Sequence, residues 1–185
     1  MSAIRTSRCF VNMRSRDKAV GLPPVFDENS IVLILGSFPS VKSRETSFYY
    51  GHTQNRFWKM LSKYFNEAIP QTATERKAFI LRHNIALWDM VTACDILGSA
   101  DASVKNAEVA DLQIIFSKTS LKGILLNGTL AYDLFMQTYS KINIPYQKMP
   151  STSPANPRYD ETIWHQALDR VFICNKRNKN NDSQK

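Results

Sequence analysis

The chain has 185 residues, of which 43% are apolar and 22% charged, as is ordinary for one globular domain with a single core. No apolar run approaches the roughly 18 residues that a membrane-spanning helix needs, so a membrane protein is not expected. The formal net charge is +8, but residues 31–173 carry only +3 of it, so charge alone is weak support for nucleic-acid binding.

Both ends of the chain are basic. The first 16 residues contain four arginines and three serines without an acidic residue, which is typical of a disordered leader or of an organellar transit peptide. We expect a disordered basic leader over 1–20, a single domain over 21–173 and a disordered basic tail over 174–185. The expected location is cytoplasmic and nucleoid-associated, with organellar targeting as the alternative.

Short strands and helices alternate along the chain. In order, the pattern predicts a buried strand at 31–35, helices at 56–65 and 72–82, a strand at 85–88, a helix at 110–118, a strand at 123–126, a helix at 130–138, a strand near 147–149 and a helix at 161–172. This alternation predicts a three-layer α/β/α fold with a short, mainly parallel central sheet of about four strands.

The loops after the predicted strands are rich in Gly, Pro, Asn and Ser. In a parallel sheet, ligands bind at the carboxyl ends of the strands. We therefore expect the loops at 36–55, 88–106, 127–129 and 150–158 to share one face of the molecule and to form the functional site.

The cysteine and histidine patterns argue against metal and disulfide chemistry. Cys9, Cys94 and Cys174 are odd in number and widely spaced, which favours a reduced compartment and cannot supply four thiolates to an iron–sulfur cluster. The three histidines lack metal-ligand spacing. We expect no metal and no cofactor, and no lysine stands out as a Schiff-base nucleophile.

Two separated motifs carry the functional signal. The turn Gly36-Ser-Phe-Pro-Ser40 alone is weak, because it lacks the P-loop and dinucleotide-binding patterns. Together with Tyr49-Tyr50-Gly51-His52 and Asn55-Arg56-Phe57-Trp58, it resembles the first active-site motif of the uracil-DNA glycosylase superfamily. Pro150-Ser-Thr-Ser-Pro-Ala-Asn156 resembles the second motif, which inserts into DNA at the lesion.

The resemblance extends from about Gly21 to Phe172 and is strongest to the hypoxanthine (deoxyinosine) DNA glycosylase branch, which is related to the mismatch-specific uracil/thymine enzymes. The segments 87–91 and 101–106 also resemble the hypoxanthine branch. Phe38 stands where the mismatch branch has an asparagine, and the aspartate of the classical uracil enzymes is absent too. In the hypoxanthine branch the water-orienting role passes to a later asparagine, which matches Asn55.

The resemblance implies a monofunctional glycosylase of base excision repair that flips a deaminated base out of DNA and hydrolyses its glycosidic bond. Hypoxanthine is the favoured base, with uracil and xanthine as further candidates, and a monomer suffices. The implied catalytic residues are Asn55 and Ser37. The implied base-binding residues are Phe38, Tyr50, His52 and Asp89, and the implied DNA contacts are Lys42, Arg44, Ser151, Thr152, Ser153, Asn156 and Arg158.

Other interpretations of these residues stay open. Tyr50 suits core packing as well as base stacking, Asp89 suits a structural cap or pair, and Lys42 and Arg44 suit a solvated face. For the whole chain, the alternative is a catalytically silent nucleic-acid-binding module on the same fold. Generic α/β architecture also permits a nucleotide or sugar-phosphate enzyme, although the phosphate motifs are missing.

Overall fold

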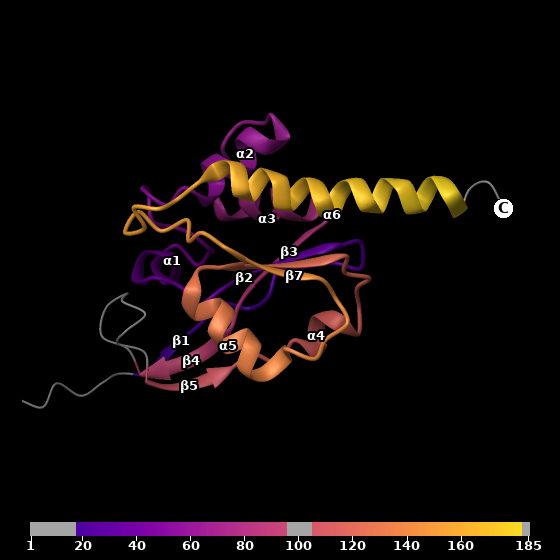
Figure 1. Cartoon of the computed structure of the whole chain (residues 1–185). Coiled ribbons are helices and arrows are strands. Elements are labelled where there is room, and N and C mark those ends of the chain that lie inside the picture. The colour runs from indigo at the N-terminus through magenta and orange to yellow at the C-terminus, as the bar shows by residue number, and fades with distance from the viewer. Residues whose placement is uncertain (1–17, 96–104, 183–185) are drawn as a thin grey trace, which may run out of the picture.

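The computed structural model of the chain describes residues 18–95 and 105–182 (Figure 1). The expectations for residues 1–17, for the first part of the 101–106 pattern and for 183–185 lie outside the described residues. None of the helices in the described part combines the length and the apolar character needed to cross a bilayer.

A four-stranded parallel sheet forms the centre of the molecule. It contains β2 (Val32–Gly36), β3 (Ile85–Asp89), β6 (Gly123–Asn127) and β7 (Tyr146–Met149), in the order β3-β2-β6-β7. Every residue of β2, β3 and β6 is buried, because helices cover both faces of the sheet. The predicted parallel core is confirmed.

Helices lie on the two faces of this sheet, which makes the three predicted layers (Figure 1). One face carries α2 (Phe57–Phe65), α3 (Ala73–Arg82) and α6 (Glu161–Asp182), and the other carries α4 (Gln113–Phe116) and α5 (Thr129–Tyr139). Thr72 and Glu75 form a capping box at the start of α3. The largest fully buried side chains include Trp164, Phe57, Phe79 and Phe135.

The last helix is longer than predicted. A helix ending at residue 172 was expected, whereas α6 continues to Asp182 and so runs into the segment expected as a disordered tail. No Gly or Pro follows Phe172 in that stretch, so the two strongest helix-ending residues are missing there.

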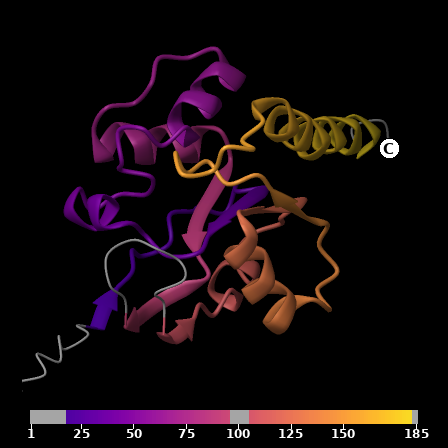
Figure 2. The ribbon, with the colours of Figure 1, turned by 60° about the vertical axis from the view of Figure 1, so that its left-hand side comes forward.

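A second, antiparallel sheet was not predicted. It pairs β4 (Val91–Asp95) with β1 (Lys18–Val20) and β5 (Lys105–Val109), at the end of the molecule opposite the free end of α6 (Figure 2). A loop had been expected at 88–106, and a leader as far as residue 20. The pairing of β4 with β5 contains register shifts, which erase the strict alternation that marks a strand in a sequence.

Candidate active site

A pocket of about 270 Å³ opens at the carboxyl edge of the parallel sheet, where the loops were expected to converge. Gly36, Asp89 and Asn127 end three adjacent strands there, and the loop after β7 closes the fourth side. The residues that line it are Gly36, Ser37, Phe38, Pro39, Ser40, Ser43, Tyr49, Tyr50, Asn55, Asp89, Asn127, Ser151, Thr152, Ser153 and Ala155.

The turn after β2 is held by the segment that links β3 to β4. The backbone N–H groups of Met90 and Val91 donate to the carbonyls of Gly36 and Ser37, at 2.9 and 3.0 Å. Arg44 donates to the carbonyl of Pro39 at 2.7 Å, and its guanidinium lies 5.3 Å from the ring centre of Phe38. Arg44, which was predicted to contact phosphate, therefore supports the turn from within, and its phosphate contact stays a prediction.

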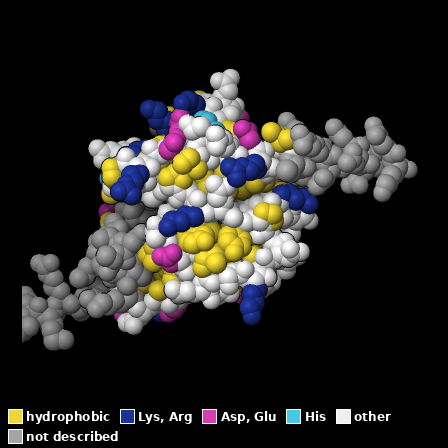
Figure 3. Space-filling view, in the orientation of Figure 1, with side chains coloured by type: hydrophobic (Ala, Val, Ile, Leu, Met, Phe, Trp, Pro, Cys, Tyr) yellow, Lys and Arg dark blue, Asp and Glu magenta, His cyan; other side chains and the backbone are white. Residues whose placement is uncertain are grey.

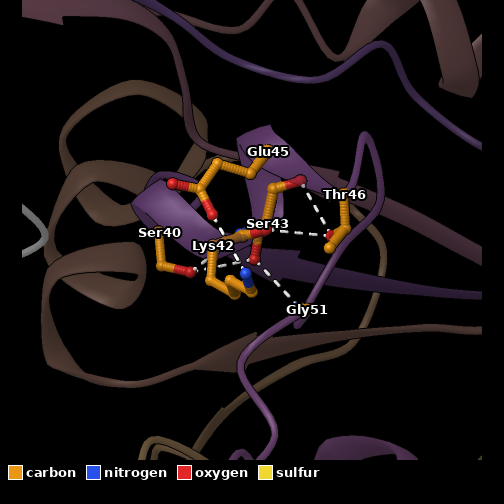
Figure 4. Close-up of polar contacts among 6 residues, drawn as sticks. All are labelled: Ser40, Lys42, Ser43, Glu45, Thr46 and Gly51. Atoms are coloured by element: carbon orange, nitrogen blue, oxygen red, sulfur yellow. Dashed lines mark hydrogen bonds and ion pairs between the residues drawn. The ribbon is translucent and has the colours of Figure 1, made fainter.

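The short helix α1 (Val41–Glu45) follows this turn and organises the segment up to Gly51 (Figure 4). The buried Ser43 is central here. Its backbone N–H donates to the Ser40 hydroxyl at 3.2 Å, and its own hydroxyl accepts from the Gly51 N–H at 3.0 Å. A Cβ atom at Gly51 would lie 2.4 Å from the Thr46 hydroxyl, so a glycine is needed for the chain to close on α1.

Tyr50 forms part of the inner wall of the pocket. Its backbone has a φ of 54°, and its ring stacks on Phe57 with the ring centres 3.9 Å apart. Its hydroxyl is buried without a hydrogen-bond partner among the described residues, and the Asn127 side chain lies nearby. Burial, together with nearby Asp89, raises the pKa of Tyr50 far above its usual value, so the phenol is neutral and can donate.

Asp89 supplies a carboxylate at the base of the pocket. It ends β3, is 4% exposed and pairs in register with Gly36. A Cβ atom built on Gly36 would lie 2.1 Å from Asp89 Oδ1 and 3.3 Å from the Tyr50 hydroxyl oxygen. The glycine is thus required because the carboxylate occupies the space of a side chain.

Asn55 lies at the start of α2 and lines the pocket while half-buried. Its Oδ1 atom accepts a hydrogen bond from the Phe57 backbone N–H at 3.0 Å, and its own N–H donates to the His52 carbonyl at 2.9 Å. The first bond fixes the orientation of the side-chain amide, and the second holds the backbone of Asn55. Since a helix N–H engages Oδ1, the Nδ2 atom is the part of the amide that is suited to donating toward a ligand.

The loop 150–158 forms the outer wall. Thr152 is buried, and its hydroxyl and N–H both bond to the Asn127 side chain at 3.0 Å. Asn156 turns the loop back on itself by donating from Nδ2 to the Ser151 carbonyl at 2.9 Å. Ser151 and Ser153 line the pocket. The roles of these four residues as DNA contacts stay predictions, and the Thr152 side chain is engaged within the protein.

Five predicted site residues do not line the pocket: Arg44 and Asn156, described above, and His52, Lys42 and Arg158. His52 is exposed, and its Nδ1 atom accepts from the Gln54 N–H at 3.2 Å, so the structure does not bring it to the other base-binding candidates. Lys42 is exposed on α1 and pairs with Glu45 at 3.1 Å, and Arg158 is exposed on the outer loop. On the face shown in Figure 3, basic side chains are dispersed.

Sequence reasoning missed two residues that the structure joins to the site. Asn127 was noted only as the start of a loop, although its place directly after a buried strand was the available signal. Arg56 was noted only within the first motif, yet it bonds to the 150–156 loop. A contact between residues about 100 positions apart leaves no trace in local sequence patterns.

The chemistry of the pocket suits a flat heterocycle with polar edges. An aromatic wall, a neutral phenol and an amide surround a buried carboxylate, so the site offers both donors and acceptors to a base inserted edge-first. Among the described residues, no three His, Cys, Asp or Glu side chains gather as a metal centre would require.

These features define an α/β/α protein with a polar pocket suited to a heterocyclic base, and comparison with known proteins identifies its family. The family model described as "Uracil DNA glycosylase superfamily" matches residues 23–170. The chain belongs to this superfamily. It is a DNA glycosylase, and DNA is its substrate.

Individual relatives agree with this assignment. A protein of Methanosarcina acetivorans named hypoxanthine DNA glycosylase is 34% identical over 143 residues, which cover 76% of this chain and 90% of the relative. One of the same name from Methanosarcina barkeri is 36% identical over 113 residues, which cover 60% and 72%. The solution NMR structure of a candidate uracil DNA glycosylase from M. acetivorans matches with a TM-score of 0.73 and 29% identity, covering 84% of this chain and 99% of that one.

Proposed function

We propose that this DNA glycosylase removes hypoxanthine from DNA by hydrolysing the N-glycosidic bond of deoxyinosine. Two curated relatives, each at least 34% identical over the matched residues, carry the name hypoxanthine DNA glycosylase. A glycosylase must turn its target nucleotide out of the helix, because the bond is unreachable within the base stack. The pocket volume of about 270 Å³ leaves room for a purine.

The observation that carries this proposal is the buried Asp89 carboxylate in the pocket. Hypoxanthine presents an N1–H donor, whereas adenine presents a lone pair at N1. An ionised carboxylate only accepts hydrogen bonds, so Asp89 in this form would favour hypoxanthine and repel adenine at the same edge. The neutral Tyr50 hydroxyl is a candidate donor to the O6 acceptor that adenine lacks. Deamination would thus be recognised as an exchange of one donor and one acceptor.

Asn55 is the proposed catalytic residue. Cleavage builds positive charge on the sugar and negative charge on the departing base. A neutral amide is a poor general base, so it acts by orienting water or by donating from Nδ2 to the departing purine. Ser37, at the turn next to Asp89, is proposed to assist at the same edge. Most of the rate then comes from positioning and electrostatics.

The exposed outer ring of the pocket is proposed to hold the DNA strand. Pro154 and Ala155 are exposed on the loop that walls the pocket, where a stiff apolar tip can enter the base stack. Arg158 and Lys42 would contact phosphates. The reaction needs one active site, so we propose a monomer that acts on DNA in the nucleoid.

The test is strand scission by alkali on labelled duplexes that carry one hypoxanthine, uracil, xanthine or mismatched thymine. We expect cleavage at hypoxanthine that is lost in Asn55→Ala and kept in Asn143→Ala, which changes an exposed asparagine in a loop remote from the pocket. Cleavage at uracil alone would overturn the choice of base. Binding to the lesion duplex without cleavage of any base would favour the silent binding module.

A further inference from the structure

We infer that Arg56 is a positioning residue that holds the loop 150–156 in place relative to Asn55. This support is needed mainly when the target base must be extruded from a paired duplex. The inference rests on the proposed function, since it requires the loop to meet DNA. It adds a role for a residue that does not line the base pocket.

Arg56 bonds to three carbonyl groups of this one loop. Its backbone N–H donates to the Thr152 carbonyl at 3.1 Å. Its guanidinium donates from Nη1 to the Asn156 carbonyl at 2.9 Å and from Nη2 toward the Pro154 carbonyl at 3.4 Å. The planar fork of an arginine can reach several acceptors at once, which a lysine cannot do.

The loop needs such support because it contains no regular secondary structure. The paired bonds between Asn127 and Thr152 fix its first part to the end of β6. Beyond Thr152, the loop is held by its own turn bonds and by Arg56. Pro154 and Ala155, which are exposed, lie within the part that the guanidinium spans.

An aromatic ring holds the Arg56 guanidinium in place. The guanidinium lies over the ring of Tyr159 at 4.8 Å from the ring centre, a cation–π contact that restricts its plane. Tyr159 comes just before α6, so the ring is attached to the helical layer. Arg56 thereby connects the outer loop to two structured parts of the protein, the start of α2 and the approach to α6.

The same short segment carries Asn55. The Asn55 side chain is bonded to the first turn of α2 through the Phe57 N–H, and Arg56 is the next residue along the chain. A shift of the loop relative to α2 therefore moves the exposed Pro154 and Ala155 away from the base stack, while the Asn55 amide stays bonded to α2. Displacements of this kind, even of about 1 Å, can cost on the order of 100-fold in rate.

The discriminating experiment compares two substrates that carry the same lesion. In one, hypoxanthine is paired in a stable duplex, and in the other it lies in a single strand where it is already unstacked. We expect Arg56→Ala to lower the single-turnover excision rate about 30- to 100-fold on the duplex, but by no more than about threefold on the single strand. Arg56→Lys, which can still reach one carbonyl, should be intermediate on the duplex.

Further readouts separate positioning from folding. Arg170→Ala, which changes an exposed arginine on α6 at the opposite end of the sheet, should match the wild type on both substrates. A 2-aminopurine base beside the lesion should brighten when wild-type protein binds the duplex and much less with Arg56→Ala. If Arg56→Ala does not fold, the duplex-to-single-strand ratio of Arg56→Lys decides instead.

Two results would overturn the inference. An equal loss on both substrates would mean that Arg56 supports the chemistry or the fold in general, and no loss on either would mean that the loop is held without it. If the wild type releases no hypoxanthine, the proposed function fails. The duplex and single-strand substrates are then compared with whichever base the wild type does release. If it releases none, the difference in 2-aminopurine fluorescence between the wild type and Arg56→Ala tests the role of Arg56.

Discussion

Asn127 and Thr152 exchange two buried hydrogen bonds across 25 positions of sequence. Asn127 Nδ2 donates to Thr152 Oγ1 at 3.0 Å, and the Thr152 N–H donates to Asn127 Oδ1 at 3.0 Å. The first residue ends β6 and the second belongs to the loop after β7, so this pair closes the pocket between two neighbouring strands. It also gives both polar atoms of the buried Asn127 amide a partner.

Asn127→Ala should therefore destabilise the protein as well as open the pocket. The substitution leaves the Thr152 N–H and hydroxyl buried without their partner, so the free energy of unfolding should fall by about 1–3 kcal/mol. Urea titration measures this change, and Asn143→Ala should stay within about 0.5 kcal/mol of the wild type. Equal stability of the two variants would show that the pair contributes nothing.

Gly36→Ala should impair excision through Asp89. The added Cβ atom would lie 2.1 Å from Asp89 Oδ1, so the carboxylate must move, and the excision rate should fall at least about tenfold. The double variant Gly36→Ala/Asp89→Ala should be no slower than Asp89→Ala alone, because the clashing group is gone. Additive losses in this cycle would show that Gly36 acts by another route.

Asp89→Asn should weaken base discrimination. An amide can donate where the carboxylate only accepts, so adenine would lose its penalty while hypoxanthine would lose a charged partner. We expect slower release of hypoxanthine, by about tenfold or more, and a smaller ratio of hypoxanthine to adenine release. Competition between the two bases in one duplex measures this ratio, and an unchanged ratio would remove Asp89 from base recognition.

Arg158→Ala should weaken DNA binding without changing base choice. Loss of one phosphate contact reduces affinity for all sequences alike and lowers the slope of log affinity against log salt by about one. Lys122→Ala is the matched control, since this exposed lysine lies at the amino end of β6, opposite the pocket. A salt slope identical to that of the control would place Arg158 outside the DNA contact.

The pH dependence of stability should include a contribution from His83. Its ring stacks on that of Phe65, with the ring centres 3.6 Å apart. The pKa of His83 is lowered below 6.5 mainly because burial removes water from the ring, although nearby Glu67 acts in the opposite direction. The folded state then binds a proton less readily than the unfolded state, so stability falls as the pH drops below 6.5 toward the folded pKa. In His83→Gln, the free energy of unfolding should change less between pH 7 and pH 5; an identical change would contradict this account.

Much of the site could be predicted from local sequence patterns. The strands β2, β3 and β6 are short apolar runs, which predicted the edge of the sheet where the pocket opens. The choice of Asn55 and Asp89 at that edge came from the resemblance to the glycosylase superfamily. The second sheet could not be predicted, because its register shifts break the alternation of β4. The bond from Arg44 to the Pro39 carbonyl and the bond from Arg56 to the Asn156 carbonyl form only when the chain folds. In a sequence, an arginine that supports a loop looks the same as one that contacts phosphate.

The most direct measurement is the identity of the base that the enzyme releases. A duplex carrying both hypoxanthine and uracil, incubated with the wild type, Asn143→Ala or Asn55→Ala, is analysed for free bases by mass spectrometry. We predict preferential release of hypoxanthine by the first two proteins and none by Asn55→Ala. Release of uracil in preference to hypoxanthine, or unchanged release by Asn55→Ala, would contradict the proposed substrate or the proposed catalytic residue, respectively.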